Sequence, residues 1–203
     1  LYTSFMNEAA IERAGLAPLM RDLAQVDALS DKSAFARYMG ATYGKFGGSL
    51  FGAGPYADPA DPTMTALWMF SGGLGLPEQE YYFDAKFADQ RGAYLDYLEP
   101  TFRHIGQASP REAASRVMTF ETYVAQLNWD AEQKRQIEKI NNPMSGSELA
   151  AYAPGMDWDA FFAGHNIPPQ ERIIVTDNTA VKAIAALFAS TDLATLKLWQ
   201  KAQ

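Results

Sequence analysis

Histidine and acidic side chains are the groups in this chain that could support hydrolytic or metal-dependent chemistry. The chain holds two histidines, His104 and His165, and no cysteine. A zinc site that hydrolyses peptides commonly uses two histidines one helical turn apart together with a carboxylate, and the sequence contains no His-Glu-x-x-His. Both histidines come at expected helix ends, where an imidazolium suits the negative end of a helix dipole. We predict that both are helix-end or surface residues and that the segment binds no metal.

The acidic residues offer three close pairs, which are Glu78/Glu80, Asp157/Asp159 and Asp58/Asp61. Residues two apart on a helix point in different directions, so the first two pairs are poorly placed to share a proton as a catalytic dyad. Asp157 is expected to cap a helix over residues 158–164, and Asp58 and Asp61 are expected to form Asx-turns. The acidic residues therefore have structural explanations, and we predict no catalytic role for them.

The glycine-rich stretch Gly47–Gly54 superficially resembles a phosphate-binding loop. It lacks the Gly-Lys-(Ser/Thr) ending, and a proline-containing loop follows it instead of a helix. Backbone freedom within a strand, as at a bulge, explains these glycines better. No serine stands in a recognisable nucleophile elbow, so neither histidine has an obvious nucleophile to activate. The residues of this segment therefore predict no catalytic and no cofactor-binding site.

Composition restricts the kinds of partner that the chain can have. Its 203 residues suffice for one large domain or two small ones, and 48% hydrophobic with 20% charged residues is an ordinary globular mixture. A net charge of -7 argues against nucleic-acid binding, which needs clustered Lys and Arg. The longest apolar run, residues 183–189, is far shorter than the roughly 20 residues of a membrane span. We predict neither a nucleic-acid partner nor a membrane span in this segment.

Helical spacing of apolar residues dominates the chain, and short β-like runs interrupt it. Ser30 is a candidate N-cap, Pro100 should kink or break its helix near Glu99, and Ser109-Pro110 opens a helix in cap-then-proline order. Helices are predicted over residues 2–13, 18–26, 31–43, 87–105, 110–127, 158–164 and 179–189, with a solvated continuation over 130–139. Strands are predicted over residues 48–53, 65–70 and 173–176, the first two forming a hairpin with a long loop. The fold class is therefore predominantly α, a multi-helix domain with a small β-hairpin.

The joint between the hairpin and the long helix that follows is the most distinctive part of the sequence. It reads Leu74-Gly75-Leu76-Pro77, then two glutamates, then Tyr81-Tyr82. Pro77 suits the first position of a helix. We predict that the joint is structural, with Leu74 and Leu76 buried and with Tyr81 or Tyr82 placing its ring in the core and its hydroxyl in a hydrogen bond. Gly75 should meet a neighbour that a Cβ would displace.

Several strings along the chain occur in an order found in a known family. Besides residues 74–82, the strings are Leu1–Glu8, Gly15–Leu19, Asn142-Pro143-Met144-Ser145 with Glu148-Leu149, Asp157–Phe162 and Leu193–Lys197. Together they resemble the N-terminal region of the neprilysin and endothelin-converting-enzyme family of zinc metallopeptidases. Phe5 stands where animal members often carry Cys, which favours a bacterial-type member. A location outside the cytoplasm is favoured by this resemblance, and a cytoplasmic one stays open.

The resemblance implies a larger two-domain enzyme of which residues 1–203 are the lid-forming N-terminal region. The helical stripes at both ends suggest that the segment is truncated at both ends. In the family the zinc ligands lie further along the chain, so none maps onto a residue here. The resemblance implies a zinc metalloendopeptidase that cleaves oligopeptides. This segment would be inactive alone, pack on the missing catalytic domain, cover the cleft and limit substrate size. The alternative is a stand-alone helical module that binds peptides or a protein without catalysis.

Overall fold

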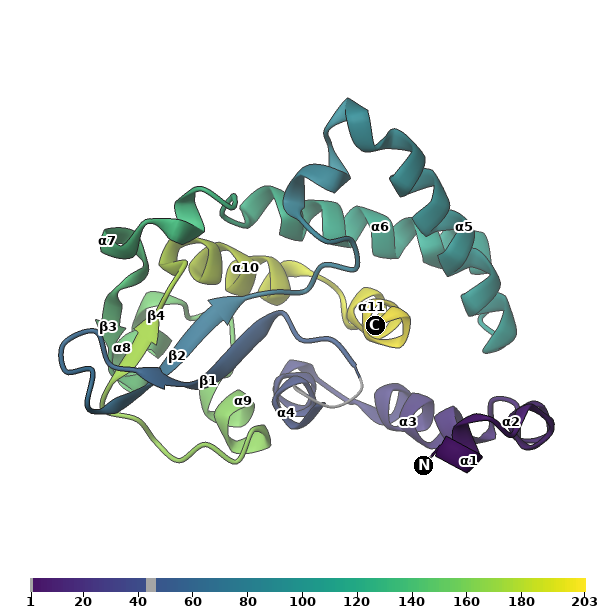
Figure 1. Ribbon diagram of the computed structural model, residues 1–203, viewed down its shortest axis with the longest axis horizontal. Coiled ribbons are helices and arrows are strands. Elements are labelled where there is room, and N and C mark those ends of the chain that lie inside the picture. Colours follow the sequence, from purple (N-terminus) through teal and green to yellow (C-terminus); the bar gives the residue numbers. More distant parts are fainter. Residues whose placement is uncertain (1, 43–46) are drawn as a thin grey trace.

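The computed structural model describes residues 2–42 and 47–203 (Figure 1). Leu1 and Tyr43, which belong to the predicted first and third helices, lie outside the described residues. The fold is predominantly helical with a small sheet, as the sequence predicted. Its elements fall into an N-terminal arm, a sheet with helices on both sides, and a pair of long helices at one end (Figure 1).

The N-terminal arm, defined here as α1 (Tyr2–Phe5), α2 (Glu8–Ala14) and α3 (Ala17–Ala28), extends from the body (Figure 1). The prediction of one helix over residues 2–13 is wrong because the chain leaves the helix at Met6. Asn7 then caps α2, its side chain accepting a hydrogen bond from the Ala10 amide at 3.1 Å. The predicted helix at 18–26 is confirmed as α3. The arm attaches near the end of α3, where Val26 is buried against the body.

Helices α4 (Lys32–Thr42) and α9 (Trp158–Gly164) lie side by side beneath the sheet (Figure 1). Two glycines allow their backbones to approach closely. A Cβ on Gly40 would lie 2.1 Å from the Phe161 carbonyl oxygen, and one on Gly164 would lie 2.0 Å from that of Arg37. The predicted cap of α4 is wrong by one residue, because the Asp31 carboxylate, rather than Ser30, accepts from the Ala34 amide at 2.8 Å.

Two long helices, α5 (Ala88–His104) and α6 (Pro110–Leu127), pack against each other. Helix α5 runs through Pro100, so a break near Glu99 does not occur. Pro110 opens α6 as predicted, but Ser109 has a left-handed backbone with φ of 52° and its side chain makes no cap hydrogen bond. The prediction of Ser109 as a side-chain cap is therefore wrong. The last two helices are α10 (Asn178–Ser190), as predicted, and α11 (Leu193–Ala202), which carries the helical stripe expected at this end of the sequence.

The sheet is mixed and has the strand order β1-β2-β4-β3. Its strands are β1 (Phe51–Ala57), β2 (Thr65–Ser71), β3 (Asn142–Met144) and β4 (Ile173–Val175). The predicted antiparallel hairpin is confirmed with Phe51 opposite Ser71 and Ala57 opposite Thr65, but its first strand lies later in the chain than 48–53. The predicted strand near 173–176 pairs parallel with β2. Strand β3 was not predicted, because three residues that include a proline carry little strand pattern.

Short helical turns connect these elements. They are the 3-10 turns η1 (Gln79–Tyr82), η2 (Ala85–Phe87) and η3 (Gln133–Arg135), together with α7 (Ile137–Ile140) and α8 (Gly146–Tyr152). Helix α6 ends at Leu127, so the predicted continuation over residues 130–139 is instead two separate turns. Pro77 likewise does not begin a helix, since η1 starts two residues later. The predictions failed here because polar segments fit both a solvated helix and a series of turns.

The core lies between the sheet and the helices and is rich in aromatic rings. Phe51 of β1 meets Trp158 of α9 with ring centroids 4.8 Å apart, and Phe120 of α6 meets Trp199 of α11 at 5.8 Å. No single helix within residues 2–42 and 47–203 combines the length and apolar character of a membrane span. Helices α10 and α11 reach that length only as a pair, across a bend of 118°.

Candidate functional site

The joint (residues 74–82) is held by the hydroxyl of Tyr82. This side chain is 4% exposed, and its oxygen accepts from the backbone amides of Gly75 at 3.0 Å and Leu76 at 2.9 Å. The hydroxyl donates to Oε2 of Glu121 on α6 at 2.8 Å. The prediction of a buried, hydrogen-bonded tyrosine in the joint is therefore confirmed for Tyr82. Tyr81 is half-buried and stacks on Phe87 with centroids 3.9 Å apart.

Gly75 is required by a close approach, as predicted. A Cβ at this position would lie 2.0 Å from the Tyr94 hydroxyl oxygen and 3.2 Å from the Glu121 carboxylate. The prediction that Leu74 and Leu76 are buried is wrong, because both are half-buried. The amides of Gly75 and Leu76 face the Tyr82 hydroxyl, and the two leucine side chains are only partly covered. Polar contacts thus hold the joint more than apolar burial does.

Glu121 is the central acceptor of a buried group that the sequence did not reveal. We define the Glu121 cluster as Glu121, Tyr82, Tyr94 and Gln203. Oε1 of Glu121 accepts from the Tyr94 hydroxyl at 3.1 Å and from Nε2 of Gln203 at 2.8 Å. Burial raises the pKa of Glu121 to about 7, although the hydrogen bonds from the two tyrosines favour the charged form and act in the opposite direction.

The position of Glu121 in the sequence indicates that its side chain is buried. It stands four residues after Val117 and three before Val124, both fully buried, so it occupies the apolar face of α6. A lone acidic residue on such a face must find hydrogen-bond donors when the helix packs. Which donors it finds depends on tertiary contacts, and spacing in the sequence does not give these.

A second buried polar group joins the end of β2 to α6 and α10. It consists of Ser71, Asn128 and Asp177, each less than a tenth exposed. The Asp177 carboxylate accepts from the Ser71 amide at 3.0 Å and also contacts the Ser71 hydroxyl, which lies close to Oδ1 of Asn128 as well. These contacts satisfy backbone and side-chain groups where three elements meet. We interpret the group as structural.

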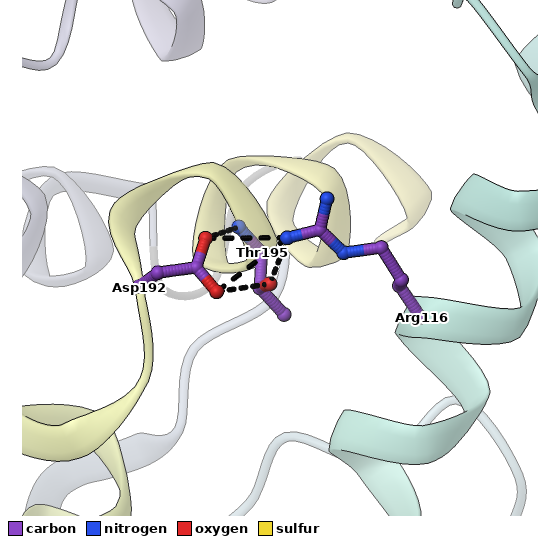
Figure 2. A network of polar contacts seen from close by, with 3 residues as sticks. All are labelled: Arg116, Asp192 and Thr195. Carbon is purple, nitrogen blue, oxygen red and sulfur yellow. Dashed lines mark hydrogen bonds and ion pairs between the residues drawn. The ribbon is translucent and has the colours of Figure 1, made fainter.

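A surface cavity, the Arg116 pocket, lies between α6 and the α10–α11 connection and has a volume of about 420 Å³. Figure 2 shows Arg116 reaching from α6 toward Asp192 and Thr195. Nη2 of Arg116 lies 3.2 Å from Oδ1 of Asp192 and 2.5 Å from the Thr195 hydroxyl. Asp192 also caps α11 by accepting from the Thr195 amide at 2.8 Å. The apolar side chains of Phe120 and Leu187 are among the lining residues of the pocket.

The Arg116 network stabilises the start of α11. The hydrogen bonds from the Thr195 hydroxyl and amide are the main reasons why the pKa of Asp192 is held below its ordinary value, with a smaller contribution from Arg116. The arrangement has a charged donor and a carboxylate that satisfy each other. It contains no pair of nucleophile and base, so its chemistry is that of recognition or packing.

The predicted structural roles of Asp58, Asp61 and Asp157 are confirmed. Asp58 and Asp61 form Asx-turns by accepting from the amides of Ala60 at 2.8 Å and Thr63 at 3.0 Å. Asp58 also forms a two-point ion pair with Arg172 at 2.7 and 3.1 Å, and the hydrogen bond from Arg172 is the largest cause of its lowered pKa. Asp157 caps α9 by accepting from the Ala160 amide at 2.9 Å.

The two histidines lie at the ends of different helices, as predicted. His104 is exposed at the end of α5, and His165 follows α9, where burial lowers its pKa. In the part of the chain that the structure describes, no three His, Cys, Asp or Glu side chains come together in a way that could hold a metal ion.

The string Asn142-Pro143-Met144 forms the edge strand β3. Nδ2 of Asn142 donates to the carbonyl oxygens of Val175 at 2.9 Å and Thr176 at 3.2 Å, which fixes β3 beside β4. This part of the family-like pattern therefore has a structural explanation, as the joint does.

Comparison with known proteins accounts for these shared strings. The model of Peptidase family M13, in its N-terminal part, matches residues 1–203. The chain belongs to this family. Endothelin-converting enzyme 1 of Bos taurus is 25% identical over 206 residues, which cover 94% of this chain and 27% of that enzyme.

Solved structures agree in both sequence and fold. The zinc metalloprotease Zmp1 of Mycobacterium tuberculosis in its open state is 26% identical with a TM-score of 0.92, over 98% of this chain and 32% of Zmp1. The same enzyme in complex with an inhibitor is 28% identical with a TM-score of 0.92, over 98% of this chain and 31% of Zmp1. The M13 chain described here thus spans about a third or less of the length of these relatives. The predicted family is confirmed.

Proposed function

We propose that residues 1–203 are the non-catalytic N-terminal region of a zinc metalloendopeptidase that cleaves oligopeptides. The observation that carries this proposal is the family match along the whole chain. The names of the relatives support it, since they include an endothelin-converting enzyme and a zinc metalloprotease. Zinc would be held by residues outside this segment. There it would activate a water molecule for attack on the peptide carbonyl.

The exposed apolar side chains of the N-terminal arm support packing on the rest of the protein. Of the described side chains in the arm helices, Val26 alone is buried. The arm instead exposes large apolar residues, which are Tyr2, Phe5, Met6, Ile11, Leu16, Leu19 and Met20. Apolar surface gathered in this way marks an interaction site. Since the chain spans 32% of Zmp1, the remaining part of the same polypeptide is the partner that we propose.

A lid role follows from the same proposal. In it, this region covers the catalytic cleft and so limits substrates to oligopeptides. Support comes from the resemblance to the family and from Zmp1, for which a state named open has been solved. A region that covers a cleft must move for substrate to enter, which fits the existence of such a state.

The test uses the full-length protein purified with and without a chelator. We expect bound zinc, hydrolysis of a short unstructured peptide, loss of that activity after chelation, and little cleavage of full-length unfolded casein. A protein without zinc and without peptide hydrolysis would contradict the assignment as an enzyme. If casein is cleaved as fast as the short peptide, the assignment as a peptidase stands, but the proposed restriction to short substrates is contradicted.

The stand-alone binding module gives a different outcome. It predicts that residues 1–203 alone melt cooperatively, stay monodisperse and capture peptides. The proposal predicts that this segment, without the rest of the protein, exposes the arm and self-associates. Light scattering of the isolated segment, with and without an unstructured peptide, separates the two.

A further inference from the structure

The Glu121 carboxylate is fully buried and receives hydrogen bonds from three elements. Tyr82 of η1 donates to Oε2 at 2.8 Å. On Oε1, Tyr94 of α5 donates at 3.1 Å and Gln203, just after α11, donates at 2.8 Å. These three donors come from segments far apart in the sequence. No cationic side chain forms an ion pair with Glu121 in the ranges 2–42 and 47–203.

The two sides of the carboxylate differ in their ability to accept a proton. The Tyr82 oxygen already accepts from the amides of Gly75 and Leu76, so both of its lone pairs are occupied and its own proton must point to Glu121. Oε2 therefore always faces a donor. The Tyr94 hydroxyl can rotate and the Gln203 amide can turn, and each can then accept a hydrogen bond in place of donating one. A proton on Glu121 thus belongs on Oε1.

We propose that the Glu121 cluster is a proton-sensitive contact, in which protonation at Oε1 reorders Tyr94 and Gln203 and leaves the Tyr82 contact with the joint in place. Protonation changes the link between α6, α5 and the end of α11, because that link runs through Oε1. The joint stays attached to α6 in both states. Protonation of Glu121 therefore changes the contacts at the end of α11 and leaves those of the joint unchanged.

The surroundings of Glu121 fit this assignment. Among the described residues, the titratable groups that face it are the phenols of Tyr82 and Tyr94, and Tyr97 stacks on Tyr94 with ring planes 13° apart. The joint contributes the Gly75 amide, and α11 contributes Trp199. Burial and the negative charge of Glu121 raise the pKa of both phenols, so they stay protonated near neutral pH. Glu121 is the member of the cluster that titrates.

The direction of the pH effect follows from the raised pKa of Glu121. Burial moves it from an ordinary 4.5 to about 7. The folded protein therefore binds the proton on Glu121 more tightly than the unfolded chain does. Its contribution to stability is therefore complete below pH 4.5 and is lost as the pH rises through about 7. Near neutrality both forms of the cluster are populated.

Infrared difference spectroscopy of the full-length protein tests the proposal through the carboxyl C=O stretch. We expect one carboxyl group that titrates near pH 7, well above ordinary glutamates. The signal should be lost in Glu121→Gln and kept in Glu112→Gln, a matched change at an exposed site on the same helix. Gln203→Ala removes a donor to the ionised form at an exposed position, so it should raise the midpoint.

Two results would overturn the proposal. One is the absence of any carboxyl that titrates above pH 6 in the wild-type protein, a measurement that needs no variant to fold. The other is a midpoint that Gln203→Ala leaves unchanged. Hydrogen exchange adds a test of the asymmetry. After correction for intrinsic rates, the amides of Gly75 and Leu76 should be equally protected above and below the pH at which Glu121 titrates. Loss of their protection at low pH would contradict the proposed asymmetry.

Discussion

At the scale of single residues, the joint depends on one hydroxyl group. Tyr82→Phe would leave the amides of Gly75 and Leu76 without their acceptor and Glu121 without one donor. We expect a loss of about 3 kcal/mol in the free energy of unfolding, because buried groups without partners are costly. Denaturant unfolding of the full-length protein measures this loss.

Tyr81→Phe is the matched control. The Tyr81 ring stacks on Phe87, and its hydroxyl makes no hydrogen bond to the residues that the structure describes. Its removal should change stability by less than about 0.5 kcal/mol. Equal effects of the two variants would show that ring packing, rather than the hydroxyl of Tyr82, holds the joint.

At the scale of secondary structure, the contact between α4 and α9 requires Gly40. Its substitution by alanine would place a Cβ 2.1 Å from a backbone oxygen, and backbone cannot move aside as a side chain can. We expect Gly40→Ala to destabilise the protein by about 3 kcal/mol. Gly92→Ala in α5 is the control, because a Cβ there meets nothing within 4 Å. Helix propensity predicts that Gly92→Ala raises the free energy of unfolding by up to about 1 kcal/mol. Thermal unfolding of both variants measures these changes.

The same elements show what the sequence could and could not predict. Helices with a regular apolar stripe, such as α6 with Val117 and Val124, were predicted correctly because periodicity records burial. Strand β3 and the caps Asn7 and Asp31 were missed or misplaced. They depend on a partner strand or on one hydrogen bond, which spacing does not encode. Glu121 was missed for a related reason, since its donors come from three segments brought together only by folding.

At the scale of the whole molecule, the N-terminal arm is the surface through which we propose that this region joins the rest of the protein. Leu19 and Met20 of α3 are 50% and 55% exposed. If the arm packs on the remaining polypeptide, Leu19→Glu with Met20→Glu should lower the melting temperature of the full-length protein by several degrees. The same pair of changes should leave that of residues 1–203 almost unchanged. Scanning calorimetry of both proteins checks this, and equal shifts would place the partner surface of α3 within the segment itself.

The two outer strands of the sheet each carry a proline, Pro55 in β1 and Pro143 in β3. Proline has no amide hydrogen to offer a further strand, and β3 is only three residues long. Each proline therefore hinders addition of a strand from another molecule at its own position along the edge. Self-association of the isolated segment through its apolar arm should accordingly yield amorphous aggregates that do not seed fibrils, and it should reverse on dilution with detergent. We therefore expect the sheet to resist amyloid growth in the isolated segment as well.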